Sequence, residues 1–316
     1  MTKENKDSKD SKENKSLIMS DTNTKGIVFT PPYVANLIAQ ILQRTDHTRV
    51  LDICAGNGAL LEPCNELNMQ IMGIEIQPEL ISIAKENIRP HIINADCFAI
   101  SDKIKEFAPN AIILNPPYTR QNKGMEFGEF ALNQAEHGIG ILLVPQNVCN
   151  GGTKDINKHI LEKHTLSMVI DMPSDLFMPH AAVKTCILIF DMGIPHNTNT
   201  SVKFIDFSND GYKRTKRKSG NLQDVDDTET KYALLPKLFT LSKDSKNNKD
   251  IISEISEVIN HKTWQGRQSD MFWDGRISLN GDDWNGSRYK IIDTRPKYED
   301  FYKTAKQFIE WELSEI

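Results

Sequence analysis

Apolar and polar positions alternate along the middle of the chain in blocks that predict strands and helices in turn. Short apolar runs closed by a glycine, proline or acidic residue are typical of buried strands, and apolar residues spaced three and four apart predict amphipathic helices. The expected strands cover a segment from residue 49 into a glycine turn and residues 69–76, 91–95, 111–114, 138–144, 166–171 and 183–191. The expected helices cover residues 31–43, 78–88, 101–107, 128–136 and 153–163. Strands that alternate with helices predict an α/β fold with a mostly parallel sheet and helices on both faces.

The two ends of the chain do not follow this pattern. Residues 1–25 are mainly Lys, Glu, Asp, Ser and Asn, and they hold too few apolar side chains to offset the entropy of ordering, so we expect a disordered tail. Beyond residue 222 the periodicity weakens, although amphipathic helices are expected around residues 251–259 and 301–313. The predicted organisation is a tail, a main domain over residues 26–222, and a C-terminal appendage over residues 223–316. The tryptophan-rich middle of the appendage predicts a small core, with a partner-docking surface as the alternative.

Composition narrows the class of protein. The 316 residues, 39% hydrophobic and 26% charged, are typical of a globular protein. No apolar run approaches the roughly 20 residues that cross a bilayer, and no signal peptide is evident, so we expect a cytoplasmic protein without a membrane partner. The five cysteines form no C-x-x-C pair, which indicates reduced thiols rather than disulfides or a zinc site. A net charge of −5 predicts that any affinity for nucleic acid is local or supplied by a partner.

The strongest chemical signal is the apolar run over residues 111–114 that ends in Asn115-Pro116-Pro117-Tyr118. Proline lacks a backbone N–H and disfavours helix in the residue before it, so Asn115 and Pro116 should be extended with outward-facing carbonyl groups. A side-chain amide oxygen, a neighbouring carbonyl and an aromatic ring together suit a planar group that bears an NH2. The structural alternative is a strand that simply stops at a Pro-Pro turn.

A second candidate site follows the first strand. The sequence from Asp52 to Gly58 predicts a strand, a glycine turn through which the backbone approaches a ligand, and the electropositive start of a helix. Leu61 stands where the dinucleotide fingerprint has its third glycine, so the turn is not shaped for a pyrophosphate. The carboxylate of Asp52 suits an ammonium group or an ordered water better than a phosphate.

Further polar residues end the neighbouring strands. Glu75 lies about 20 residues after the glycine turn, the position that holds ribose hydroxyls in doubly wound folds. Asp96 is suited to accept from an adenine amino group, and Phe98 is suited to flank the ring, although each alone is more often a surface turn or a core aromatic. Together with Asp52 and Asn115, these acids fall at the carboxyl ends of predicted parallel strands, where ligands bind. The pattern therefore predicts one site at that edge of the sheet.

These motifs resemble the S-adenosylmethionine-dependent amino-methyltransferases. The sequence is most similar to the modification subunit of type I restriction–modification systems, a gamma-type N6-adenine DNA methyltransferase. The resemblance covers about residues 26–222 and implies a Rossmann-like methyltransferase catalytic domain with a mostly parallel seven-stranded sheet. It rests on Phe29-Thr30-Pro31, the Asp52 to Gly58 turn, Glu75, Asp96, Asn115-Pro116-Pro117-Tyr118, and the later stretches Val169 to Phe177, Lys184 to Phe190 and Phe204 to Ser208.

The resemblance implies S-adenosylmethionine as cofactor, without a metal. The segment before the first helix would border the methionine moiety, the glycine turn would wrap it, Glu75 would hold the ribose and Asp96 the adenine. Asn115 and the carbonyl of Pro116 would bind the amino group of a flipped adenine, with Tyr118 stacked on the base. The candidate cofactor-binding residues are Phe29, Thr30, Pro31, Asp52, Ala55, Gly56, Gly58, Glu75, Ile76, Asp96, Cys97, Phe98 and Asn115, and the candidate catalytic residues are Asn115, Pro116, Pro117 and Tyr118.

Two basic groups are candidates for contact with double-stranded DNA. The first is the run of Lys213, Arg214, Lys216, Arg217 and Lys218, and the second is the pair Arg120 and Lys123 after the catalytic motif. The alternative for both is a solvated loop.

The sequence departs from the family in what surrounds the catalytic domain. The family's modification subunit usually carries a long helical N-terminal domain, and single-chain relatives carry a large target-recognition domain. Here a short polar tail precedes Phe29, and the residues after Leu222 are few and polar. The resemblance therefore implies a catalytic core that needs a partner, either a specificity subunit or a second methyltransferase subunit.

Other functions stay open at this level. An Asn-Pro-Pro-Tyr motif also serves methyltransferases that act on a protein glutamine N5 or on guanine N2 of RNA, because both targets present an NH2 on a planar group. Phe29-Thr30-Pro31 and the stretch over residues 171–190 favour DNA adenine. A non-catalytic S-adenosylmethionine-binding subunit is the third possibility, against which the intact catalytic motif argues.

Overall fold

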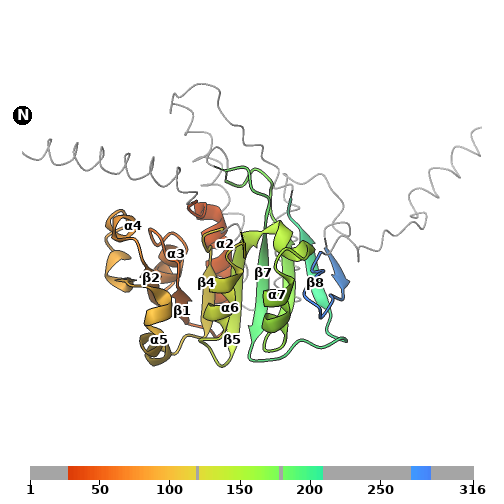
Figure 1. The fold of residues 1–316 in the computed structure, drawn as a ribbon. Helices are drawn as coiled ribbons and strands as arrows, with labels where there is room; N and C mark the ends of the chain where they lie inside the picture. The colour runs from red at the N-terminus through yellow and green to blue at the C-terminus, as the bar shows by residue number, and fades with distance from the viewer. Residues whose placement is uncertain (1–27, 119–120, 178–180, 209–271, 286–316) are drawn as a thin grey trace, which may run out of the picture.

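The computed structural model describes residues 28–118, 121–177, 181–208 and 272–285. Its centre is a nine-stranded sheet with the strand order β3-β2-β1-β4-β5-β7-β6-β8-β9 (Figure 1). The strands are β1 (Arg49–Asp52), β2 (Gln70–Glu75), β3 (Ile92–Asn94), β4 (Ala111–Leu114), β5 (Gly138–Pro145), β6 (Thr165–Asp171), β7 (Thr185–Met192), β8 (Val202–Asp206) and β9 (Phe272–Gly275). The predicted α/β class is confirmed, whereas the predicted number of seven strands is too small for the part of the chain described.

The sheet is parallel over its first half. β3, β2, β1, β4 and β5 run in the same direction, and β8 is parallel to β6. β7 lies antiparallel between β5 and β6, and β9 is antiparallel to β8. β4 shows why the central strands read as apolar runs, because all of its residues are buried between helices on the two faces.

The helices are α2 (Pro32–Gln43), α3 (Leu61–Glu66), α4 (Pro78–Ser82), α5 (Ser101–Phe107), α6 (Met125–Leu132) and α7 (Lys154–Leu161). Short 3₁₀ turns cover η1 (Arg89–His91), η2 (Cys97–Ala99) and η3 (Gln146–Asn150). None of the helices described combines the length and the hydropathy that a bilayer-crossing helix has.

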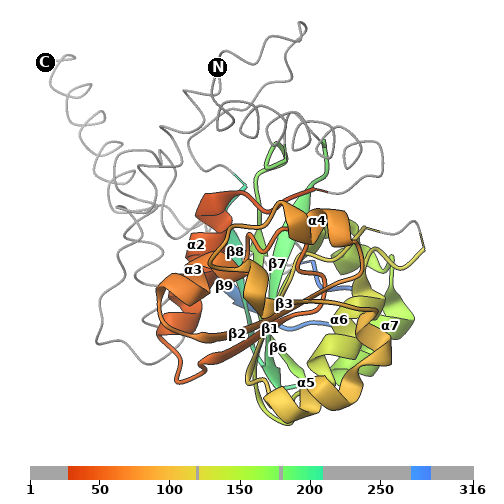
Figure 2. The same ribbon diagram turned by 90° about the vertical axis from the view of Figure 1, so that its left-hand side faces the viewer.

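Alternating side chains of the strands form two apolar cores. One core joins one face of the sheet to α2 and α3, and the other joins the opposite face to α5, α6 and α7. Figure 2, turned by 90°, shows α2 and α3 on one side of the strands and α5, α6 and α7 on the other. The result is a three-layer arrangement, in agreement with the predicted doubly covered sheet.

Two predicted helices have wrong boundaries. The helix expected over residues 78–88 ends at Ser82, and the chain continues through i→i+3 bonds such as Ile83 N to Leu80 O and Ala84 N to Ile81 O. These bonds tighten the backbone into 3₁₀-type turns. The helix expected from residue 128 begins three residues earlier, at Met125, because Gly124 has φ +87° and turns the chain into it.

Residues 272–285 complete the far edge of the sheet. β9 pairs with β8 in the register Val202 opposite Gly275. Trp284 is 0% exposed and packs edge-on against Phe190 of β7, with ring centroids 6.0 Å apart. The backbone N–H of Trp284 donates to the carbonyl of Cys149 over 2.8 Å. This part of the predicted appendage therefore belongs to the core of the main sheet; the remaining expectations for residues 1–25 and 223–271 and for the C-terminal helix lie outside the described residues.

Candidate active site

Four neighbouring strands present a polar residue at or just beyond their carboxyl ends. Asp52 ends β1, Glu75 ends β2, Asp96 follows β3 by two residues and Asn115 directly follows β4. β1 and β4 lie side by side at the point where the strand order reverses. Ligands of open α/β sheets bind at such a switch point, so the topology places the candidate residues where a ligand site is expected.

A cavity of about 300 Å³ lies over these strand ends. The structure brings most of the predicted site residues together around it, namely Phe29, Thr30, Asp52, Ala55, Gly56, Glu75, Ile76, Asp96, Cys97, Phe98, Asn115, Pro116, Pro117 and Tyr118. Pro31 and Gly58 are not part of its lining. Pro31 instead precedes α2, where its carbonyl accepts from Val34 N and Ala35 N.

Several lining residues carry no signal in the sequence that sets them apart. Most are neighbours of the predicted residues, and these are Val28, Ile53, Cys54, Asn57, Ala59, Leu60, Gln77, Leu80 and Ala95. Phe127 is different because it comes from α6 and belongs to no motif. Proximity to the motifs in the sequence therefore identifies the neighbouring residues, but it does not identify Phe127.

The two glycines of the turn after β1 have different structural roles. Gly56 has φ +55°, and a Cβ added there would meet only the ring of Phe29, at 3.7 Å, so its backbone is open toward the cavity. Gly58 has φ +79°, and an added Cβ would lie 2.4 Å from a methyl group of Ile88. Gly58 therefore serves close packing beneath the turn, whereas Gly56 leaves room for a ligand.

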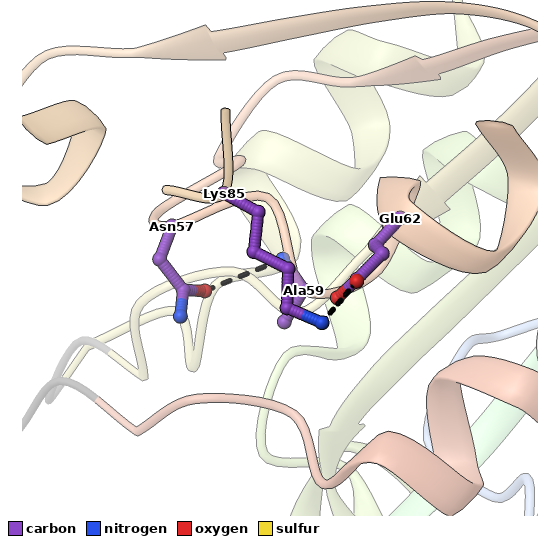
Figure 3. A network of polar contacts seen from close by, with 4 residues as sticks. All are labelled: Asn57, Ala59, Glu62 and Lys85. Carbon is purple, nitrogen blue, oxygen red and sulfur yellow. Dashed lines mark hydrogen bonds and ion pairs between the residues drawn. The ribbon is translucent and has the colours of Figure 1, made fainter. Parts of the chain in front are cut away.

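One polar contact lies within this turn, and an ion pair lies just beyond it. Figure 3 shows the side-chain oxygen of Asn57 accepting from the backbone N–H of Ala59 over 3.3 Å and the ion pair between Lys85 and Glu62. Asn57 and Ala59 line the cavity, whereas Glu62 and Lys85 do not. Because the Lys85 side chain is 70% exposed, the ion pair contributes little to stability.

Glu75 joins β2 to the glycine turn. The side chain is 7% exposed, and its Oε2 accepts from Gly56 N and its Oε1 from Gln77 N, both over 2.8 Å. These bonds fix the orientation of the carboxylate. Each of its oxygens keeps a second lone pair, so the group can accept from two hydroxyls of a ligand without losing the contacts that hold it.

Asp52 is buried beside the same turn. It is 1% exposed, and its Oδ1 accepts from Cys54 N over 2.9 Å. Burial raises the pKa of Asp52 to about 8, the nearby charge of Glu75 adds to the rise, and the Cys54 N–H opposes it. A cation bound at this point would favour the ionised carboxyl group, so Asp52 is suited to an ammonium ligand.

Two large apolar side chains stay exposed where they line the cavity. Ile76 is 63% exposed and Phe98 is 48% exposed. The ring of Phe98 packs against Phe127 and Phe130 of α6, with centroids 5.5 and 4.7 Å apart. Asp96 Oδ1 accepts from Phe98 N over 3.0 Å and fixes the start of η2. Exposed apolar surface beside a carboxylate suits a flat heteroaromatic ligand that carries an amino group.

Hydrogen bonds at both ends fix the amide of Asn115. Its Nδ2 donates to the carbonyl of Val28 over 3.1 Å and to Thr30 Oγ1 over 3.0 Å. Its Oδ1 accepts from the hydroxyl of Tyr118 over 2.8 Å. The amide oxygen keeps one lone pair, with which it can accept from a target N–H.

Tyr118 stands between the amide and the apolar core. Its ring meets Phe177 edge-on with centroids 6.4 Å apart, and its hydroxyl lies 3.4 Å from the carbonyl of Leu143. Burial raises the pKa of Tyr118 well above its usual range, so the hydroxyl stays protonated and serves as a donor. The structure thus gives Tyr118 a contact with Asn115 that the sequence did not predict.

Gly124 shapes the Pro-Pro loop from behind. It has φ +87°, and an added Cβ would lie 2.7 Å from Pro116 Cγ and 3.0 Å from the carbonyl oxygen of Pro117. The start of α6 therefore rests directly against the loop that carries the Asn-Pro-Pro-Tyr motif. Lys123, next to it, has φ +56° and is the one basic candidate that the structure describes; Arg120 and the basic run over residues 213–218 lie outside the described residues.

Comparison with known families decides what kind of protein this is. The family model for N-6 DNA Methylase matches residues 16–137 and 121–262. The chain belongs to the N-6 DNA Methylase family. The predicted membership in the N6-methyltransferases is thereby confirmed, and it covers both the glycine turn and the Asn-Pro-Pro-Tyr motif.

Two curated proteins are similar to this chain. The type II restriction enzyme and methyltransferase RM.BcgI of Heyndrickxia coagulans is 27% identical over 327 residues, which cover 93% of this chain and 47% of the relative. The type II methyltransferase M.CvrRI of Paramecium bursaria Chlorella virus XZ-6E is 26% identical over 160 residues, 50% of this chain and 39% of the relative. The chain therefore spans less than half the length of both relatives.

Solved structures support the fold of this chain. A structure of a type I restriction–modification system has a TM-score of 0.56 at 14% identity and covers 95% of this chain and 67% of that chain. A protein described as the modification subunit of a type I restriction enzyme from Vibrio vulnificus has a TM-score of 0.51 at 15% identity and covers 70% of this chain and 56% of that chain. The predicted Rossmann-like methyltransferase fold is confirmed.

Proposed function

We propose that the chain is a DNA adenine N6-methyltransferase that uses S-adenosylmethionine. The observation that carries the proposal is the position of Asn115, whose oriented amide lines the same cavity as Asp52, Glu75 and Asp96. An acceptor for an NH2 group and a set of carboxylates suited to a nucleoside with an ammonium group share one cavity. The N-6 DNA Methylase family match supports this combination.

The cavity fits the cofactor by the chemistry of its lining. Glu75 keeps one lone pair on each oxygen for the ribose hydroxyls, and the buried Asp52 suits the ammonium of the methionine moiety. Ile76 and Phe98 offer exposed apolar surface for the adenine, beside the carboxylate of Asp96. Because Gly56 has no side chain, the backbone there can approach the cofactor closely. When bound, S-adenosylmethionine supplies a methyl group on an electrophilic sulfonium.

Asn115 and Pro116 act on the target amine. N6 of adenine is a poor nucleophile because its lone pair is delocalised into the ring. Asn115 Oδ1 and the carbonyl of Pro116 would accept its two N–H groups, favour a pyramidal nitrogen and stabilise the positive charge that develops during transfer. The fixed amide would also orient the target nitrogen for the transfer.

A duplex base reaches this cavity only when it is flipped out of the helix. Flipping costs a few kcal/mol, and stacking of a base on an aromatic ring returns about 1–3 kcal/mol. Tyr118, Pro116 and Pro117 line the cavity next to Asn115 and would form the wall against which the base rests. The Tyr118 ring would supply the stacking face.

We further propose that a separate subunit selects the DNA sequence. The net charge of this chain, −5, supplies little general affinity for phosphates. A specificity subunit or a second methyltransferase subunit would provide additional contacts to the DNA.

The proposal is tested by mapping N6-methyladenine at base resolution in host DNA. The chain is expressed alone and with its genomic neighbours, as wild type, as Asn115→Ala and as Asn133→Ala, an exposed asparagine at the end of α6 that serves as control. We expect methylation in a defined sequence context that is lost only in Asn115→Ala. Soluble protein that binds S-adenosylmethionine but adds no methyl group to adenine in any combination would contradict the proposal and direct the search to protein and RNA substrates.

A further inference from the structure

Asn115 is held by a segment from a distant part of the chain. Both of its Nδ2 hydrogens are donated to residues that precede α2, one to the carbonyl of Val28 and one to the hydroxyl oxygen of Thr30. The partners are 87 and 85 residues away in the sequence. Thr30 is 6% exposed, so the contact to its hydroxyl is protected from competing water.

The two contacts have different consequences for the amide. The oxygen and nitrogen ends of an asparagine have nearly the same shape, and only the hydrogen bonds decide which end faces which neighbour. The carbonyl of Val28 can only accept, so it draws the nitrogen end toward the segment before α2 and leaves the oxygen end for the target amine. A single hydrogen bond, however, leaves the amide plane free to swing about that bond.

The second contact restricts this swing. An NH2 group that donates to two separate acceptors defines the plane of its amide, and Thr30 Oγ1 is the second acceptor. The hydroxyl of Tyr118 cannot replace it, because that hydroxyl donates to the oxygen end of the amide and does not accept from its NH2 group. Thr30 is thus the side chain whose replacement leaves an N–H of Asn115 without its acceptor.

We propose that Thr30 is a positioning residue for methyl transfer: its hydroxyl oxygen holds the plane of the Asn115 amide so that Oδ1 faces the target amine. This inference rests on the proposed function. It gives Thr30 a task toward the target, distinct from the place beside the methionine moiety that the sequence resemblance implied. Because Thr30 lines the cofactor cavity as well, one short segment sets the geometry on both sides of the transferred methyl group.

The inference is tested on the full chain with whatever partner its methylation requires. Thr30→Val removes the acceptor at almost constant shape, Thr30→Ser keeps the hydroxyl, and Thr48→Val changes an exposed threonine as control. We expect Thr30→Val to lower the single-turnover rate of methyl transfer about 10-fold, the effect of losing a hydrogen bond to a positioned group. We expect Thr30→Ser to stay within about 3-fold of wild type, and the Kd for S-adenosylmethionine to change less than about 3-fold in both variants.

A second readout observes Asn115 directly. In protein labelled with ¹⁵N-asparagine, the side-chain N–H groups of Asn115 should exchange slowly in wild type and in Thr30→Ser, and one of them faster in Thr30→Val. If Thr30→Val proves unstable, Thr30→Ala takes its place with the same expectation. An unchanged rate in Thr30→Val overturns the inference, and so does a rate loss matched by an equal loss of cofactor affinity with unchanged exchange. Wild-type protein that methylates no DNA overturns the proposed function instead, and the exchange data then decide by themselves whether Thr30 holds Asn115.

Discussion

Asp52 is a carboxyl group that the fold places out of contact with water, at 1% exposure. Its folded-state pKa, about 8, lies above the ordinary value of 3.8 because burial disfavours the charged form. The stability that this group contributes is therefore fully present below pH 3.8 and is lost as the pH rises through about 8. Burial of this carboxyl group beside the cavity destabilises the ligand-free protein, and a bound cation would offset that destabilisation.

Replacing Asp52 by Asn should make this cost visible. In the cofactor-free protein we expect the Tm of Asp52→Asn to exceed that of wild type at pH 8.5 by on the order of 5 °C more than it does at pH 5. Thermal unfolding followed by circular dichroism measures the difference. Asp102→Asn, at an exposed position in α5, is the control and should show no such dependence. Parallel Tm curves for wild type and Asp52→Asn would refute the assignment of a buried, protonated carboxyl group.

At the residue scale, the sequence predicts those site residues whose chemistry follows from local spacing. Asp52 and Glu75 end apolar runs, and both line the cavity. The contact between Thr30 and Asn115 was out of reach, because it joins segments 85 residues apart and only the packing of α2 against the sheet brings them together. Gly58 shows a different limit of prediction from sequence. The glycine spacing that predicts a ligand-binding turn also occurs where a glycine is needed for close packing.

At the scale of elements, η3 and α7 hold the C-terminal strand segment in place through one buried asparagine. Asn157 is 0% exposed, and its Nδ2 donates to the carbonyls of Val148 and Gly281, each over 3.0 Å. Its Oδ1 accepts from Thr153 Oγ1 over 2.9 Å. A Cβ on Gly281 would lie 2.2 Å from the carbonyl of Lys154, so the segment lies directly on the start of α7.

We predict that Asn157→Ala destabilises the protein by about 2–4 kcal/mol, because two buried carbonyls and a hydroxyl lose their partner at once. Urea unfolding monitored by tryptophan fluorescence measures the change in the free energy of unfolding. The matched control is Asn133→Ala, whose Nδ2 donates to Glu129 O at an exposed position and whose loss should cost less than about 1 kcal/mol. An equal effect in both variants would argue that residues around 281 are not held by Asn157.

The periodic elements were predictable because each is encoded by its own residues. β5 and β7 are long apolar runs, and α2 combines apolar side chains at helical spacing with a proline in its first turn. α4 was predicted too long because helical spacing continues past Ser82, whereas the backbone bonds there are of the i→i+3 type. Local pattern indicates the kind of element, and tertiary packing decides where it stops.

At the scale of the whole molecule, the sheet extends further than the sequence indicated. β8 and β9 escaped prediction as members of the sheet because both are short strands at one end of the sheet, and their partners are set by topology. The pairing of Val202 with Gly275 joins residues 73 positions apart, and no local feature of either segment indicates the other. Trp284 was likewise predicted to belong to a separate appendage. Its contact with Phe190 depends on the same long-range pairing of the C-terminal segment with the sheet.

The packing of residues 272–285 against the sheet leads to a prediction for a protein that ends at residue 222, the boundary expected from the sequence. Such a protein lacks β9 and Trp284, a fully buried side chain whose loss alone typically costs about 3–5 kcal/mol. We expect the shortened protein to unfold at a Tm well below that of the full chain, with Trp284→Ala in the full chain showing part of the same loss. Differential scanning calorimetry compares the three proteins.

The shortened protein also separates stability from ligand binding. The candidate cofactor cavity lies over β1 to β4, whereas β9 is at the opposite edge, five strands beyond β4 in the sheet. Whatever fraction stays folded should therefore bind S-adenosylmethionine with a Kd within about 3-fold of the full chain, because no residue of the deleted segment that the structure describes lines that cavity. Equal Tm values for the shortened and full-length proteins would show that residues 272–285 are dispensable to the core. A large loss of affinity at unchanged Tm would place part of the deleted segment at the cavity itself.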